Sequence, residues 1–222
     1  MPSPPPDHAS ARRRMVAFIA ETVRDPRVLA ALGQAPRERF VPPGLERLAY
    51  DDGPLPIGAG QTISQPLIVA MMTEALELSG GERVLEVGTG SGYQAAVLSL
   101  LAGRVVTVER LPELARSAAA RLAALGYRNV EVHEAAGGVL GWPEAAPYDA
   151  IIVAAAGPQL PPSLVAQLGP SGRLVMPVGG PAEQELLVVR RDGEKLRRRS
   201  LGPCRFVPLI GGEAWTVAPD QE

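Results

Sequence analysis

The sequence has few of the residues from which disulfide frameworks, metal centres and histidine-dependent active sites are built. One of its 222 residues is cysteine and two are histidine. Cys204 alone can form neither an intramolecular disulfide nor a cysteine-rich zinc site. His8 stands near the amino terminus, and His133 is expected to be a strand residue on the surface. The composition therefore shows no Ser–His–Asp pattern and no cluster of metal ligands.

Long apolar runs and an excess of basic residues are also missing. The longest apolar runs fall short of the ~18–20 residues that a membrane helix needs, and residues 1–10 lack the apolar core of a secretory signal. The formal net charge is -2, whereas a dedicated nucleic-acid-binding protein usually carries a basic excess. We therefore expect a cytoplasmic, soluble, monomeric protein with no nucleic-acid partner and no membrane partner.

Glycine and proline are plentiful, with 24 and 23 residues, and they divide the chain into recognisable parts. Residues 1–10 are rich in proline and serine and are expected to form a disordered tail. Residues 11–222 are expected to form a single domain. Between residues 36 and 66, proline and glycine recur too often for regular structure over most of the segment. Its aromatic and aliphatic residues favour an ordered, functional loop.

From Pro66 onward, short apolar strands alternate with helical patterns. This alternation is typical of an α/β fold with a mostly parallel sheet and helices on both faces. Asp192-Gly193 predicts a hairpin that adds antiparallel strands at one edge. The expected strands are Arg83–Val87, Arg104–Glu109, Val130–His133, Tyr148–Val153, Arg173–Pro177, Glu185–Arg190, Lys195–Arg199 and Arg205–Leu209.

A glycine-rich turn predicts a cofactor pocket. Gly88, Gly90 and Gly92 follow a strand and precede a helix. Glycines let the backbone turn sharply and let a ligand lie against bare peptide. Ligand crevices of open α/β sheets lie at the carboxyl ends of the strands. Glu109 ends the next strand, where its carboxylate can accept hydrogen bonds from both hydroxyls of a ribose.

The spacing of this turn separates two cofactors. NAD-binding sequences carry Gly-x-Gly-x-x-Gly, whereas here Tyr93 stands where the last glycine would be. That spacing, and Glu86 inside the strand, favour S-adenosylmethionine, which has no pyrophosphate. With Thr89 and Ser91 in the turn, the pattern predicts a Rossmann-like class I methyltransferase sandwich. A turn without ligand and a hydride-transferring oxidoreductase remain the alternatives.

Several segments resemble the motifs of one family, the protein-L-isoaspartate O-methyltransferases. Ile57–Pro66 (IGAGQTISQP) is similar to its signature, and Pro36–Pro42 (PRERFVP), Leu85–Ala96 (LEVGTGSGYQAA) and Arg205–Leu209 (RFVPL) are similar to further motifs in the same order. The resemblance implies an S-adenosylmethionine-dependent enzyme acting on isoaspartyl-containing proteins or peptides. It would methylate the free carboxylate of the damaged residue and so start repair through a succinimide.

The resemblance also implies a catalytic loop. Carried over, Ser64 is the catalytic hydroxyl with Thr62 beside it, and Gln61, Ile63 and Gln65 lie at the cofactor. Either hydroxyl can instead cap the helix that follows. The reaction needs no general base, because a carboxylate with a pKa near ~4 is already ionised at neutral pH.

The chain departs from the family pattern at the adenine end of the expected pocket. The family has Gly-Asp-Gly shortly before Gly-Trp, and the best alignment places Ala136 at the acid and Gly137 after it. Glu134 can replace the missing carboxylate only if the loop shifts. The departure leaves three readings open: weaker cofactor binding, a same-fold methyltransferase acting on a different peptide or protein carboxylate, and a non-catalytic binding module.

Overall fold

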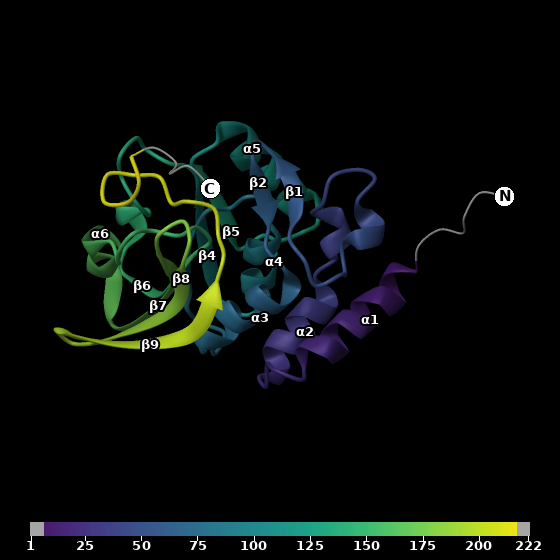
Figure 1. The fold of residues 1–222 in the computed structure, drawn as a ribbon, viewed down its shortest axis with the longest axis horizontal. Helices are drawn as coiled ribbons and strands as arrows, with labels where there is room; N and C mark the ends of the chain where they lie inside the picture. Colours follow the sequence, from purple (N-terminus) through teal and green to yellow (C-terminus); the bar gives the residue numbers. More distant parts are fainter. Residues whose placement is uncertain (1–6, 217–222) are drawn as a thin grey trace.

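The chain folds around a seven-stranded sheet in the order β5-β4-β3-β6-β7-β8-β9 (Figure 1). The structure is a computed structural model that describes residues 7–216. The first five strands in this order, β5, β4, β3, β6 and β7, pair in parallel, and β8 and β9 add an antiparallel edge. The predicted α/β class is confirmed. The strands are β3 (Arg83–Val87), β4 (Arg104–Glu109), β5 (Val130–Glu134), β6 (Tyr148–Val153), β7 (Leu168–Gly179), β8 (Gln184–Asp192) and β9 (Lys195–Cys204).

The central strands are apolar on both sides because each side of the sheet is covered. Successive residues of a strand point to opposite faces, so β3, β4 and β6 each contribute to two hydrophobic clusters. One cluster contains Val84, Val105 and Ile152 and also buried apolar residues of the helices between residues 8 and 99. The other contains Leu85, Val106 and Ile151 and the buried Leu164 of the helix Pro162–Ala166.

Within residues 7–216, six helices surround the sheet, and four of them begin with proline in the first turn, where its missing N–H costs no hydrogen bond. Helices α1 and α2 pack beside α3 at one end of the molecule (Figure 1). The helices are α1 (His8–Ile19), α2 (Pro26–Gln34), α3 (Pro66–Ala75), α4 (Tyr93–Ser99), α5 (Pro112–Ala124) and α6 (Pro162–Ala166), with 3₁₀ turns at Arg37–Arg39, Glu46–Leu48 and Pro143–Ala145.

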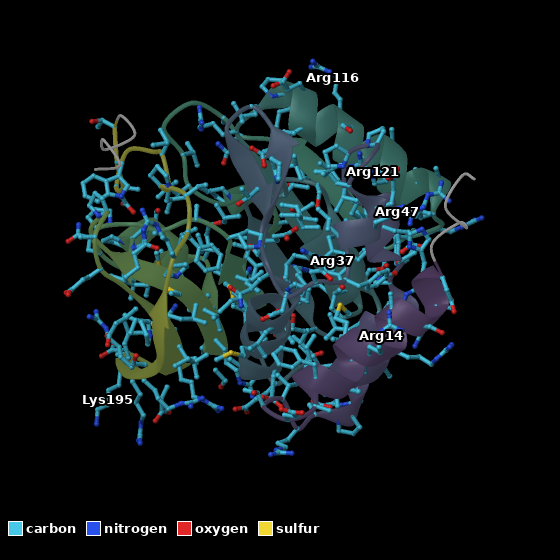
Figure 2. All side chains as sticks on the ribbon, turned by 45° about the vertical axis from the view of Figure 1, so that its right-hand side comes forward. Arg14, Arg37, Arg47, Arg116, Arg121 and Lys195 are labelled. Carbon is cyan, nitrogen blue, oxygen red and sulfur yellow. The ribbon has the colours of Figure 1, made fainter. Side chains whose placement is uncertain are left out.

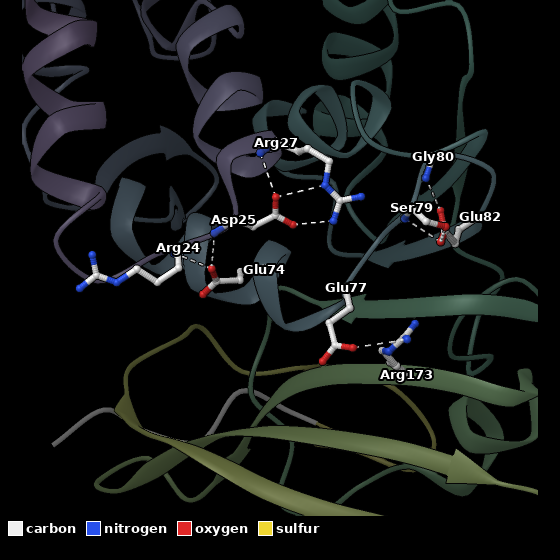
Figure 3. Close-up of polar contacts among 9 residues, drawn as sticks. All are labelled: Arg24, Asp25, Arg27, Glu74, Glu77, Ser79, Gly80, Glu82 and Arg173. Atoms are coloured by element: carbon white, nitrogen blue, oxygen red, sulfur yellow. Dashed lines mark hydrogen bonds and ion pairs between the residues drawn. The ribbon is translucent and has the colours of Figure 1, made fainter.

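Carboxylates fix the amino-terminal helices and the segment after α3 in place (Figure 3). Glu74 of α3 accepts hydrogen bonds from the backbone N–H groups of Arg24 (2.6 Å) and Asp25 (2.8 Å). Asp25 in turn caps α2 by accepting from the N–H of Arg27 at 2.9 Å. Glu77 pairs with Arg173 of β7 at 3.5 Å. The helical layer is thereby bonded both within itself and to the sheet.

The boundary of the predicted amino-terminal tail is wrong. Helix α1 begins at His8, not at Ala11, because the Asp7 side chain accepts from the N–H of Ser10 at 3.0 Å and so caps the first turn. Residues 1–6 of the predicted tail lie outside the described residues.

Two further segments differ from the prediction. Residues 55–63 form a two-stranded antiparallel hairpin, β1 (Leu55–Gly58) and β2 (Gln61–Ile63), whose turn has positive φ at Gly58, Ala59 and Gly60. Arg205–Leu209 does not form a strand. Its Phe206 instead pairs with the Gln184 side chain, donating to Oε1 at 2.7 Å and accepting from Nε2 at 3.2 Å.

Across residues 7–216, every helix is too short or too polar to pass through a bilayer.

Candidate active site

A cavity of about 1340 Å³, its open mouth included, lies at the carboxyl ends of β3, β4, β5 and β6. Segments far apart in the sequence form its walls. The glycine turn follows β3, Glu109 ends β4, and residues 135–141 follow β5. Residues 61–64, from β2 and the residue after it, and residues 206–211 near the carboxyl terminus form further walls. This is the position at which open α/β sheets bind ligands.

The glycine turn presents bare backbone to the cavity. Gly88 and Gly90 have φ of 96° and 52°, which residues with a Cβ rarely adopt. A Cβ on Gly90 would stand 3.3 Å from the side chain of Ile57. Gly92 serves a different purpose: a Cβ there would stand 3.2 Å from Leu122, so it permits α5 to pack against the turn. Gly92 does not line the cavity.

Glu109 is oriented by the backbone on both sides. Its Oε2 accepts from the N–H of Gly90 at 2.8 Å and its Oε1 accepts from the N–H of Leu111 at 3.0 Å. The side chain lines the cavity and is 7% exposed. Each carboxylate oxygen has two acceptor positions, so one on each oxygen stays available to a ligand. The geometry suits a pair of adjacent hydroxyls, as on a ribose.

Glu86 does not line the cavity, contrary to the expectation of a cofactor contact. It lies buried beneath the glycine turn, and its Oε2 accepts from the Thr107 hydroxyl at 2.5 Å. The Thr107 hydroxyl is also 2.6 Å from that of Thr89, which lines the cavity. Burial raises the pKa of Glu86 to about 8; the Thr107 hydrogen bond opposes this rise and the charge of Glu109 adds to it. Glu86 therefore reaches the cavity only through two hydroxyls.

Ser64 and Thr62 both line the cavity, together with Gln61 and Ile63. Neither hydroxyl caps α3. The N-cap of α3 is Gln65, which makes no capping bond, and the N–H of Leu67 donates instead to Asp52 at 2.9 Å. The Gln65 side chain also donates to Asp52, at 3.1 Å, and Gln65 does not line the cavity. Because Asp52 does the capping, the hydroxyl of Ser64 has no structural task at the helix.

The end of the cavity beyond Glu109 carries no acidic side chain. Ala136 and Gly137 line it as expected. Glu134 does not, because its side chain is turned toward Arg116, 3.4 Å away. Among the described residues that line the cavity, Glu109 is the one carboxylate.

Two buried glutamines that the sequence did not reveal hold the cavity walls. Gln167 donates to the carbonyl of Leu140 and accepts from the N–H of Trp142, both at 2.8 Å. Gln184 fixes the carboxyl-terminal wall, as described above. His133, expected on the surface, is partly buried and stacks on the Trp142 ring at 4.1 Å between centroids. No sequence signal marks these contacts, since their partners are distant in the chain.

The family model for Protein-L-isoaspartate(D-aspartate) O-methyltransferase (PCMT) matches residues 13–214. The chain belongs to this family. The match includes the glycine turn, Glu109 and the Ser64 loop, and it confirms the resemblance seen in the sequence.

Individual relatives agree with the family match. Protein-L-isoaspartate O-methyltransferase 1 of Rhodopseudomonas palustris (strain HaA2) is 58% identical over 217 residues, which cover 96% of this chain and 88% of that protein. The enzyme of Methanoregula boonei is 53% identical over 213 residues, covering 95% and 98%. A solved protein-L-isoaspartate O-methyltransferase matches with a TM-score of 0.82 and 28% identity, covering 91% of this chain and 67% of its own.

A structure from Plasmodium falciparum, in complex with S-adenosyl-L-homocysteine, shares the fold with a TM-score of 0.75. It is 21% identical and covers 91% of this chain and 97% of its own.

Proposed function

We propose that this protein transfers the methyl group of S-adenosylmethionine to the free carboxylate of L-isoaspartyl residues in damaged proteins. The observation that carries the proposal is that Ser64, the residue after the β1–β2 hairpin, lines the same cavity as the glycine turn and Glu109. Relatives named for this activity are 53% to 58% identical over nearly the whole chain. We also propose that the protein is a monomer and acts in the cytoplasm.

The cavity fits S-adenosylmethionine. Gly88 and Gly90 line the cavity without side chains, and Glu109 presents two free acceptor positions. We assign the ribose hydroxyls to Glu109, the methionine end to the glycine turn, and the adenine end to Ala136 and Gly137. When bound, S-adenosylmethionine supplies a methyl group that its sulfonium has already activated.

The residues of the acceptor side have a limited task. The acceptor carboxylate is ionised without a base, so Ser64 and Thr62 need only hold it in line with the methyl carbon and keep water away. The methyl ester then cyclises to a succinimide without the enzyme, since methoxide leaves more readily than oxide. Hydrolysis of the succinimide returns some normal aspartyl linkage, which is the repair.

A methyl-transfer assay tests the proposal. Labelled S-adenosylmethionine is incubated with two peptides that differ only in carrying isoaspartate or aspartate. We expect label on the isoaspartyl peptide alone. Label on the aspartyl peptide would favour a different carboxylate as the acceptor. Label on neither, with calorimetry still showing cofactor binding, would make the protein a binding module.

Ser64→Ala tests the acceptor side of the cavity. Losing a hydrogen bond to a charged carboxylate costs about 1.5–3 kcal/mol, so kcat/KM for the isoaspartyl peptide should fall by about 10- to 150-fold. The cofactor dissociation constant, from calorimetry, should not change. Ser200→Ala in β9, outside the cavity, is the matched control. Equal activity of the two variants would remove Ser64 from the reaction.

A further inference from the structure

Arg37 is a fully buried cation behind the Ser64 loop. It belongs to the first 3₁₀ turn and has 0% exposure. Figure 2 shows it near the centre of the molecule, whereas Arg116 and Lys195 reach its outer edge. A buried guanidinium is costly unless its donors are satisfied or its charge is paired, so its surroundings indicate what it does.

The guanidinium of Arg37 joins two segments of the irregular region through their carbonyl groups. Its Nε donates to the carbonyl of Ala49 at 2.7 Å, and its Nη2 donates to the carbonyl of Ser64, also at 2.7 Å. The second bond ends on the residue whose hydroxyl we place at the acceptor carboxylate. Arg37 itself does not line the cavity.

Among the described residues no carboxylate forms an ion pair with this cation; burial lowers the pKa of Arg37, and the charges of Tyr93 and Asp52 partly oppose this. None of the ion pairs formed by the described residues involves Arg37. Its charge lies instead over the Tyr93 ring, 4.7 Å from the centroid, and Tyr93 lines the cavity. The Arg37 Nη1 and the Tyr93 hydroxyl are both buried and interact with each other without a hydrogen bond of good geometry. The bonds to the Ala49 and Ser64 carbonyls are therefore the well-formed hydrogen bonds of this guanidinium.

We propose that Arg37 is a positioning residue for methyl transfer, holding the Ser64 carbonyl from behind so that the Ser64 hydroxyl faces the acceptor carboxylate. The inference rests on the proposed function and assigns a task to a residue that touches neither substrate nor cofactor.

The indirect arrangement follows from the chemistry. Methyl transfer uses a lone pair of the acceptor carboxylate, and the carboxylate loses its charge in the product. A guanidinium bonded directly to that carboxylate would stabilise the ground state more than the transition state. Acting through the Ser64 carbonyl, Arg37 can fix geometry without binding the reacting oxygens. Its planar fork suits two fixed carbonyls, which a lysine cannot reproduce.

The test compares Arg37→Met and Arg37→Lys with wild type, using kcat and KM for an isoaspartyl peptide at saturating S-adenosylmethionine. A misplacement of about 1 Å in an active site costs about 100-fold, and we expect kcat to fall by that order in Arg37→Met. The dissociation constant of S-adenosylhomocysteine should stay unchanged. Arg37→Lys should fold, and its kcat should stay close to that of Arg37→Met rather than that of wild type. If Arg37→Met does not fold, the kcat of Arg37→Lys is the test of the proposal.

Ile19→Ala is the matched control for lost stability. Ile19 is fully buried among the amino-terminal helices, and it neither lines the cavity nor forms a hydrogen bond to the Ser64 loop. Ile19→Ala should lower Tm without changing kcat. Folded Arg37 variants with wild-type kcat and KM would overturn the proposal.

A second measurement separates this inference from the proposed function. Hydrogen exchange of the backbone amides of residues 61–65, in the presence of S-adenosylhomocysteine, should be faster in the Arg37 variants and unchanged in Ile19→Ala. If wild type does not methylate the peptide but this exchange difference is seen, the proposed function fails and the loop-holding contact stands. Unchanged exchange in the Arg37 variants would overturn the inference whatever the wild-type activity.

Discussion

Glu86 and Glu109 lie on neighbouring strands and yet have different surroundings. Glu109 borders the cavity and is oriented by two backbone N–H groups. Glu86 is fully buried, with one hydroxyl donor and one oxygen that has no partner. A carboxylate that is held by two N–H groups and still has free acceptor positions suits a ligand. Burial without enough hydrogen-bond donors instead favours the protonated form of a carboxyl group. The two acids therefore call for separate tests.

Glu109→Gln should weaken cofactor binding. The carboxylate is expected to accept two ribose hydrogen bonds, and the amide of glutamine keeps one acceptor oxygen, so one bond to a charged group is lost. Such a bond contributes about 1.5–3 kcal/mol, so the dissociation constant should rise by about 10- to 150-fold. Calorimetry with S-adenosylhomocysteine measures it. The control is Glu134→Gln, at the end of β5 and outside the cavity. An unchanged constant in Glu109→Gln would show that the ribose lies elsewhere.

Glu86 should make the stability of the protein depend on pH. Its ordinary pKa is 4.5, and in the folded protein the pKa is about 8. Between these values the folded state binds more protons than the unfolded state, so the free energy of unfolding falls as pH rises. The free energy of unfolding is measured by urea titration at several pH values between 4.5 and 8 for wild type and Glu86→Gln. It should fall with rising pH in wild type and fall less in the variant. Parallel pH profiles would mean that Glu86 is already ionised in the folded protein.

At the scale of elements, the cavity is formed by loops held in place by residues from other parts of the chain. Asp52 caps α3, Gln167 holds the wall after β5, and Gln184 holds the carboxyl-terminal wall. Strands β3 and β4 fix the glycine turn and Glu109 more rigidly, through their parallel pairing. We therefore expect cofactor affinity to depend on the strand ends and on the loop after β5, and acceptor affinity to depend on the Ser64 loop.

The loop after β5 offers a gain-of-function test. An acid at Ala136 can accept from the adenine amine, and a hydrogen bond of about 1–1.5 kcal/mol would tighten cofactor binding by about 5- to 10-fold in Ala136→Asp. Ala120→Asp on the exposed side of α5 adds the same charge away from the cavity and should leave affinity unchanged. If Ala136→Asp binds no tighter, Ala136 does not occupy the position of the family acid.

At the scale of the whole molecule, exposed apolar side chains are scattered. The large hydrophobic residues most exposed among the described residues lie on separate segments: Phe18, Leu48, Leu100, Val139 and Leu196. Stable interfaces need a contiguous apolar patch. Sedimentation equilibrium should therefore give the mass of one chain, 23.3 kDa, with and without S-adenosylhomocysteine. A dimer mass at micromolar concentration would contradict this expectation.

The sequence by itself determined the features that depend on neighbouring residues. The bounds of β3, β4 and β6 were predicted correctly, because buried parallel strands are short apolar runs ended by turn residues. The glycine turn and the acid at the end of β4 were found for the same reason. Of the expected site residues, Gln65, Glu86 and Gly92 alone do not line the cavity, and each adjoins a residue that does.

Only the tertiary structure decided which distant groups meet. The capping of α3 by Asp52, the glutamines behind the cavity walls and the bond from Arg37 to Ser64 join residues that are 15 to 27 positions apart. Hydrogen bonds of this kind have no period in the sequence, and a buried polar side chain takes whichever partner the packing brings near. Local patterns thus placed Glu109 and the bare turn at the carboxyl ends of β4 and β3, while packing left the Ser64 hydroxyl without a capping role at α3.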